Sequence, residues 1–117
     1  MPRILIVDDD PETALLLSDL LVELGYETLG PVHSVSAALA LLDASQPDAA
    51  IIDVRLGAED SYPVADRLVR ENVPFMFATG YAGEAISERF EGARVLPKPF
   101  GFEAVQTAIA DLLKPSG

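Results

Sequence analysis

The sequence contains no cysteine, and only 8 of its 117 residues are lysine or arginine. Without cysteine, disulfide bonds, thiolate metal sites and a cysteine nucleophile are all excluded. Against the 8 basic residues stand 19 aspartates and glutamates, which give a formal net charge of −11. Binding to a phosphate backbone depends on lysine and arginine, so this balance argues against nucleic acid and against anionic membranes as partners.

Long apolar runs are also missing. The apolar run Ile4–Val7 is short and is followed by three aspartates, whereas a helix that spans a membrane needs about 20 apolar residues. A secretory signal needs a basic segment and then a longer apolar one. We therefore expect neither a membrane span nor a signal peptide, and we expect the protein in the cytoplasm.

The sequence does have a regular alternation of two apolar patterns. Short runs rich in branched residues predict strands buried on both faces. These runs are Ile4–Val7, Ala49–Ile52, Phe75–Ala78 and Val95–Leu96, with a weaker one at Tyr26–Val32. Apolar residues at helical spacing lie between them and after the last one. This order predicts an α/β fold, a five-stranded doubly wound parallel sheet of flavodoxin-like type with helices on both faces.

Capping residues place the ends of the predicted helices. Asp10 and Pro11 suit the start of a first helix that runs to about Leu24, and Gly25 suits its end. Ser34 suits the cap of the second helix, Pro63 falls in the first turn of the third, and the last covers about 102–113. Only 14 residues separate Thr79 from Arg94, so we expect the fourth helix to be short or irregular.

The length of the chain suits one domain, because domains typically have about 100–150 residues. We therefore expect residues 1–117 to form a single domain with no output domain.

Polar residues follow four of the five predicted strands. They are Asp8, Asp9 and Asp10 after the first strand, Asp53 after the third, Thr79 after the fourth and Lys98 after the fifth. Ligands of open α/β sheets bind at the carboxyl ends of the strands, so we expect these side chains to meet at one edge. Clustered carboxylates repel one another unless a cation lies between them, and hard oxygen ligands select Mg²⁺ or Ca²⁺. With the Thr79 hydroxyl and the Lys98 ammonium, the cluster suits a phosphoryl site in which Asp53 is the nucleophile.

The order Asp-Asp, Asp, Thr, Lys-Pro across the strand ends resembles the receiver domain of two-component response regulators, over nearly the whole chain. The resemblance implies roles for individual residues: Asp53 is the phosphoacceptor, Asp8 and Asp9 the acidic metal-binding pair, Thr79 the switch hydroxyl and Lys98 the active-site lysine. It also implies a Mg²⁺ cofactor that takes the main-chain carbonyl of Arg55. The resemblance raises the expected frequency of a cis Lys98–Pro99 peptide, but the sequence leaves cis and trans both open. A sensor histidine kinase or a phosphotransfer protein would supply the phosphoryl group.

A finer resemblance lies in residues 73–81, Val-Pro-Phe-Met-Phe-Ala-Thr-Gly-Tyr. This segment is similar to the Pro-Phe-x-Phe-Ala-Thr-Gly-Tyr signature of the FATGUY receivers, which are mostly single-domain regulators often paired with HWE-type histidine kinases. It implies a stand-alone receiver, a monomer or weak dimer, that acts through a downstream protein effector or serves as a phosphate sink or relay. Val95 stands where the family usually has the Tyr or Phe of its switch, so we expect Tyr81 or the loop around it to move instead.

Two other functions compete with this interpretation. A phosphorylation-independent interaction module could keep the same fold, although the complete set of polar groups argues against it. A turnover phosphatase of the haloacid dehalogenase type also uses an aspartate after a strand, but it needs a second acid two residues later, where this chain has Arg55. We therefore expect a protein that catalyses only its own phosphorylation and dephosphorylation.

Four further residues have competing roles. We interpret Asp10 as a helix cap, and His33 as a loop or surface residue and not as a phosphotransfer histidine. Arg55 and Tyr81, two residues after Asp53 and Thr79, either control the access of water to the phosphoryl group or serve packing or salt bridges.

Overall fold

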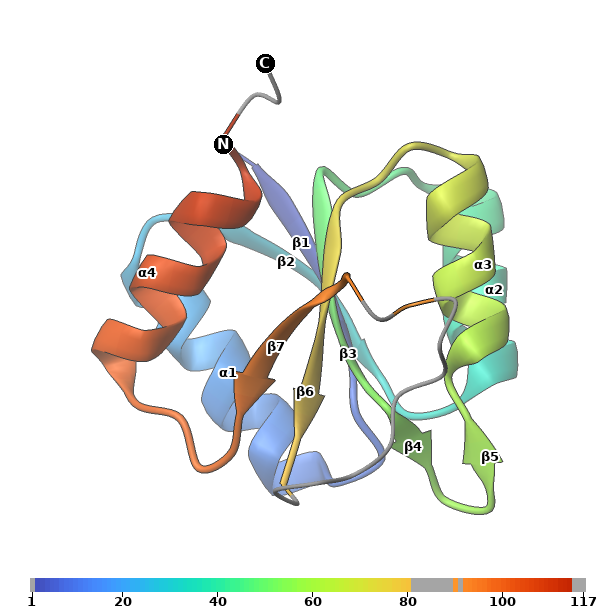
Figure 1. The fold of residues 1–117 in the computed structure, drawn as a ribbon, viewed down its shortest axis with the longest axis horizontal. Helices are drawn as coiled ribbons and strands as arrows, with labels where there is room; N and C mark the ends of the chain where they lie inside the picture. The colour runs from blue at the N-terminus through green and yellow to red at the C-terminus, as the bar shows by residue number, and fades with distance from the viewer. Residues whose placement is uncertain (1, 81–89, 91, 115–117) are drawn as a thin grey trace.

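The computed structural model describes residues 2–80, 90 and 92–114, and Figure 1 shows the arrangement. Five parallel strands form one sheet in the order β2-β1-β3-β6-β7. The strands are β1 (Arg3–Val7), β2 (Glu27–Val32), β3 (Ala49–Asp53), β6 (Phe75–Thr79) and β7 (Arg94–Pro97). The predicted five-stranded parallel sheet is thus confirmed, and each strand lies within one residue of its predicted ends.

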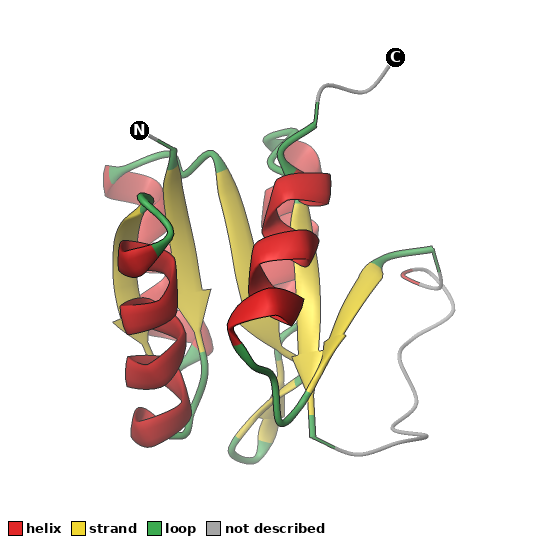
Figure 2. Ribbon diagram, turned by 90° about the vertical axis from the view of Figure 1, so that its left-hand side faces the viewer, coloured by secondary structure: helices red, strands yellow, loops and turns green. Residues whose placement is uncertain are grey.

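Helices cover both faces of the sheet (Figures 1 and 2). They are α1 (Pro11–Glu23), α2 (Val35–Ala44), α3 (Tyr62–Arg70) and α4 (Phe102–Leu112). α1 and α4 pack on one face, and α2 and α3 pack on the other. None of the helices in the described part of the chain is long and apolar enough to cross a membrane. The predicted short fourth helix between Thr79 and Arg94, and Tyr81 with it, lie outside the described residues.

The core consists of two apolar layers, one on each face of the sheet, and successive strand residues alternate between them. In β1, Ile4 and Ile6 pack with the α1 and α4 side, while Leu5 and Val7 pack with the α2 and α3 side. All four side chains are at most 1% exposed. Burial on both faces explains why these strands appear in the sequence as continuous apolar runs. It also fixes the register of the strands, so that their carboxyl ends meet at one edge.

The predicted helix caps are present. The Asp10 side chain accepts a hydrogen bond from the main-chain N–H of Glu12 at 3.3 Å, which confirms its interpretation as a cap. Gly25 follows α1 with φ +96°, a left-handed conformation that favours glycine. Ser34 accepts a hydrogen bond from the N–H of Ala37 at 3.1 Å and caps α2.

A small antiparallel hairpin follows β3 and was not predicted. It consists of β4 (Arg55–Leu56) and β5 (Glu59–Asp60), with Gly57 at φ +67° in the turn. Two-residue strands are too short to produce a hydrophobic period, so the sequence holds no pattern from which to predict them. In Figure 1 the hairpin lies at the end of the sheet to which the arrowheads of β6 and β7 point.

We expect the face covered by α2 and α3 to depend strongly on Phe77. This side chain is fully buried, and its ring contacts those of Tyr62, Phe75 and Phe90 at centroid distances of 6.0, 5.5 and 5.7 Å. Phe77→Ala should lower the free energy of unfolding by about 3–5 kcal/mol in urea titrations. Val69→Ala is the control: Val69 is 56% exposed, and its loss should change stability by less than about 0.5 kcal/mol. Similar effects for the two variants would contradict this description of the core.

Candidate functional site

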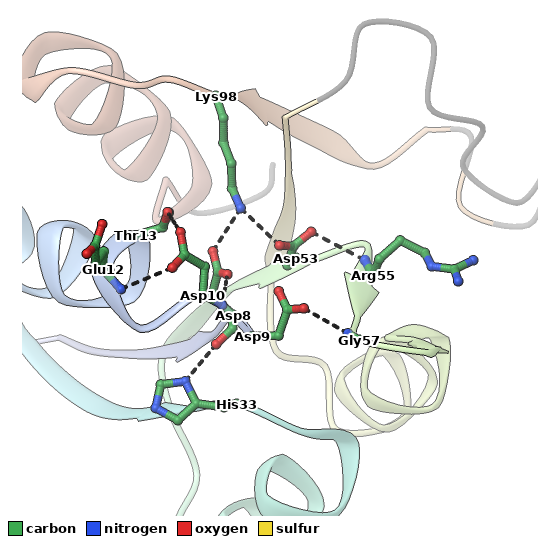
Figure 3. A network of polar contacts seen from close by, with 10 residues as sticks. All are labelled: Asp8, Asp9, Asp10, Glu12, Thr13, His33, Asp53, Arg55, Gly57 and Lys98. Atoms are coloured by element: carbon green, nitrogen blue, oxygen red, sulfur yellow. Dashed lines mark hydrogen bonds and ion pairs between the residues drawn. The ribbon is translucent and has the colours of Figure 1, made fainter.

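Four polar residues predicted from the strand ends lie at the carboxyl edge of the sheet, and Figure 3 shows three of them, Asp8, Asp53 and Lys98. Asp8 follows β1, Asp53 ends β3, Thr79 ends β6 and Lys98 follows β7. Asp8, Asp53 and Thr79 are each at most 9% exposed, while Asp9 next to them is exposed. One carboxylate oxygen from each of Asp8, Asp9 and Asp53 lies within 4.8 Å of the other two. The structure therefore brings three acids from two strand ends into one cluster.

Lys98 bridges the two buried acids of this cluster. Its Nζ donates hydrogen bonds to Asp8 Oδ2 and to Asp53 Oδ2, each at 2.9 Å. Its main-chain N–H donates to the carbonyl of Thr79 at 2.8 Å, which ties the end of β7 to the end of β6. The Lys98–Pro99 peptide, whose isomer the sequence left open, is cis.

Burial and charge shift the pKa values of Asp53 and Lys98 upwards. Burial raises the pKa of the Asp53 carboxyl above its usual value, and the charge of Asp8 adds to the rise, while Lys98 opposes it. Burial alone lowers the pKa of Lys98, but hydrogen bonds with Asp53 and Asp8 outweigh burial, and the net pKa is raised. Lys98 thus stays positively charged, whereas the ionised form of Asp53 is disfavoured. Lys98 alone does not balance the negative charges of Asp8, Asp9 and Asp53.

The β4–β5 hairpin contacts the cluster through main-chain N–H groups. The N–H of Gly57 donates to Asp9 Oδ2 at 2.8 Å, and the N–H of Arg55 donates to Asp53 Oδ1 at 3.3 Å. In Figure 3 the Arg55 side chain extends away from the three carboxylates. The hairpin therefore orients two acids with its main chain.

Asp8 is held more firmly than Asp9. Its Oδ1 accepts a hydrogen bond from the N–H of Asp10 at 2.9 Å, and its N–H donates to the carbonyl of Val32 at 3.0 Å. Its main-chain carbonyl lies 2.7 Å from Nδ1 of His33. The buried position of Asp8, near 3% exposure, is thus matched by a partner for each of its polar groups.

The three carboxylates suit a Mg²⁺ ion. Mg²⁺ prefers oxygen ligands at about 2.0–2.1 Å, so opposite ligands of one ion lie about 4.2 Å apart. Three oxygens of the cluster, one from each residue, lie within 4.8 Å of one another and need only a small adjustment to meet this geometry. A divalent cation would also relieve the repulsion between Asp8 and Asp53. The donor set and its charge therefore fit the predicted metal.

Sequence reasoning missed two residues that contact the cluster, Gly57 and His33. Gly57 acts through its main-chain N–H, which no side-chain pattern reveals. His33 was assigned to a loop or the surface; its side chain is indeed exposed, but it also contacts Asp8. The available signal was that His33 is a polar residue directly after the second predicted strand. This signal was weak because His33 has no second histidine or cysteine nearby.

Comparison with known proteins gives one family. The response regulator receiver domain matches residues 4–110. Among curated relatives, RpaA of Synechocystis sp., a DNA-binding dual master transcriptional regulator, is 34% identical over 97% of this chain and 50% of its own length. TcrA of Mycobacterium tuberculosis, a transcriptional regulatory protein, is 34% identical over 86% of this chain and 42% of its own. The chain thus spans half or less of these relatives.

Solved structures include similar chains of similar length. SdrG from Sphingomonas melonis is 43% identical, with a TM-score of 0.87 over 97% of this chain and 98% of that one. SdrG in its BeF₃-activated conformation gives a TM-score of 0.83 over 96% of each chain. TrrA from Thermotoga maritima, in complex with Mg²⁺–BeF, is 26% identical with a TM-score of 0.85 over 97% of this chain and all of that one.

We predict that Mg²⁺ stabilises the fold through the three carboxylates. At a hundredfold excess over its dissociation constant, it should add about 2.7 kcal/mol to the free energy of unfolding. Asp9→Ala should fold but lose most of this gain. Asp19→Ala removes the same charge from an exposed position on α1 and should keep it. Melting curves with Mg²⁺ or with a chelator test this prediction, and equal gains in both variants would contradict it.

We also predict that Asp53→Asn is more stable than the wild type in the presence of a chelator at pH 7. The pKa of Asp53 is raised in the folded chain, so ionisation of this group opposes folding at every pH above its usual value. The uncharged amide should add on the order of 1 kcal/mol, the usual size of a single-residue effect. The advantage should shrink as the pH falls through the raised pKa, because the wild-type carboxyl is then protonated.

Urea titrations of both proteins at pH 7 and pH 5 measure this difference. A variant that is less stable than the wild type at pH 7 would contradict the prediction. Mg²⁺ should reverse the order at pH 7, because only the wild type offers the third carboxylate.

Proposed function

Because this chain belongs to the family of response regulator receiver domains, we propose that it accepts a phosphoryl group on Asp53 from a histidine kinase or a phosphotransfer protein. Receiver domains act with histidine kinases in two-component phosphorelays and are not turnover enzymes. The observation that carries the proposal is the bridge from Lys98 Nζ to Asp53, at 2.9 Å, beside two further acids. It combines a nucleophile, a cation and the ligands for a metal.

In the proposed reaction, a carboxylate oxygen of Asp53 forms a bond to phosphorus while the P–N bond of the donor phosphohistidine breaks. The donor imidazole keeps the electron pair of the broken bond. Asp8, Asp9, Asp53 and the main-chain carbonyl of Arg55 would hold Mg²⁺, which neutralises charge on the phosphoryl oxygens. Lys98 would release Asp53 Oδ2 and pair with a phosphoryl oxygen, and Thr79 would donate a hydrogen bond to another. Hydrolysis of the acyl phosphate would later return Asp53 to its free state.

We further propose that the protein is a single-domain receiver of the FATGUY subclass with an HWE-type kinase as donor. The segment at residues 73–81 carries the resemblance to that subclass, and the similarity to SdrG over 98% of that chain supports a stand-alone receiver. The signal would then pass to a protein effector or along a phosphate relay. Val95, on β7 and 45% exposed, has no ring to rotate, so the proposal assigns the switch to Tyr81 or the loop around it.

The test is intact-protein mass after incubation with acetyl phosphate or phosphoramidate, with and without Mg²⁺. The wild type should gain one base-labile phosphoryl group that depends on Mg²⁺, and Asp53→Asn should gain none. Lys98→Ala should react about 100-fold more slowly, as expected for loss of one group that stabilises transition-state charge. Asp19→Asn, on the exposed face of α1, should match the wild type.

Two results would contradict the proposal. A phosphoryl group that persists in Asp53→Asn would place the reaction at another residue. No modification by either small donor or by an HWE-type histidine kinase would favour a phosphorylation-independent interaction module.

A further inference from the structure

His33 makes a contact that the proposed reaction does not use. Its Nδ1 lies 2.7 Å from the main-chain carbonyl of Asp8, although the two residues are 25 positions apart in the chain. A carbonyl oxygen carries no hydrogen, so Nδ1 is the donor and the imidazole is held in the tautomer with a proton on that atom. In Figure 3 the ring lies on the far side of Asp8 from Lys98.

An irregularity in the sheet brings His33 to this position. In the pairing of β1 with β2, Leu5 lies opposite Leu29 and Val7 lies opposite Val32. One residue of β1, Ile6, therefore faces two residues of β2, Gly30 and Pro31. The first of these is Gly30, at φ +91°, where a Cβ would lie 2.8 Å from the N of Val32 and 3.1 Å from the carbonyl O of Ile6. Glycine is therefore required there. The chain beyond this bulge continues past Asp8 to His33.

The carbonyl that His33 holds belongs to the peptide between Asp8 and Asp9. This peptide is planar and trans, so fixing the direction of its C=O also fixes the direction of the Asp9 N–H. The N–H of Asp8 is fixed by the carbonyl of Val32, the last residue of β2, at 3.0 Å. Two hydrogen bonds from consecutive residues, Val32 and His33, thus set the main-chain orientation that both acidic side chains share.

We propose that His33 is a positioning residue for the divalent cation site: it sets the peptide plane between Asp8 and Asp9, and so the relative orientation of their carboxylates. The inference rests on the proposed Mg²⁺ site. Removing the donor should weaken Mg²⁺ binding without unfolding the protein, because the His33 side chain is exposed. Partners that orient metal ligands typically contribute about 10–100-fold to metal affinity.

Isothermal titration calorimetry with MgCl₂ on four proteins tests the proposal. His33→Leu should raise the dissociation constant about 10-fold. His33→Asn should stay close to the wild type, because its amide nitrogen sits as many bonds from Cα as Nδ1 and also donates. Ser34→Ala is the matched control: it removes the cap of α2 at the next residue, and should lower the melting temperature while leaving the dissociation constant unchanged.

The outcomes separate this inference from the proposed function. If the wild type binds Mg²⁺ and His33→Leu binds it equally well, the positioning role is wrong and the metal site stands. Equal weakening in His33→Leu and His33→Asn would likewise overturn it, because the donor atom would not be the cause. If the wild type does not bind Mg²⁺, both the metal site and this inference fail.

Discussion

The contact between Lys98 and the two buried carboxylates is the constraint on which the site depends. Asp8 and Asp53 are brought together by the pairing of β1 with β3, and each is at most 9% exposed. Two negative charges in such surroundings raise the free energy of the folded chain unless a cation lies between them. Lys98 supplies that charge from β7, two strands away from β3 in the sheet. The order of the strands therefore brings Lys98 to the two acids, and the charge of Lys98 in turn stabilises the strand ends that hold them.

Much of this arrangement could be predicted from the sequence because buried strands appear in it as short continuous apolar runs. Strands such as β1 and β3 are apolar on both faces, and their ends are marked by aspartate, so both the sheet and the edge that carries the site follow from local patterns. Asp10 and Gly25 likewise place the ends of α1 through their own chemistry. The same pattern suggested a metal site with Asp53 as the nucleophile, while the switch role of Thr79 and the metal contact of the Arg55 carbonyl came from a resemblance to a family.

The features that escaped prediction act through the main chain or across long sequence distances. The β4–β5 hairpin contacts Asp9 and Asp53 with N–H groups that every residue except proline has, so residue types there are uninformative. His33 reaches Asp8 because a bulge shifts the register of β2. Such a shift cannot be predicted from the sequence, because it produces no periodic pattern of apolar residues. Val69 lies on α3 and is apolar but 56% exposed, so residue type alone does not tell which side of that helix faces the core.

In the β4–β5 hairpin, the groups that orient the acids are distinct from the groups that form the surrounding surface. Because Gly57 and Arg55 orient the acids with main-chain groups, the side chains of the hairpin carry little of that task. Arg55, Glu59 and Asp60 are exposed and belong to this hairpin, which begins two residues after Asp53. Substitutions at these exposed positions can therefore change the charge and shape of the surface close to Asp53. They would leave the geometry of the acids unchanged. Partner choice and reactivity can diverge independently in a chain as short as this one.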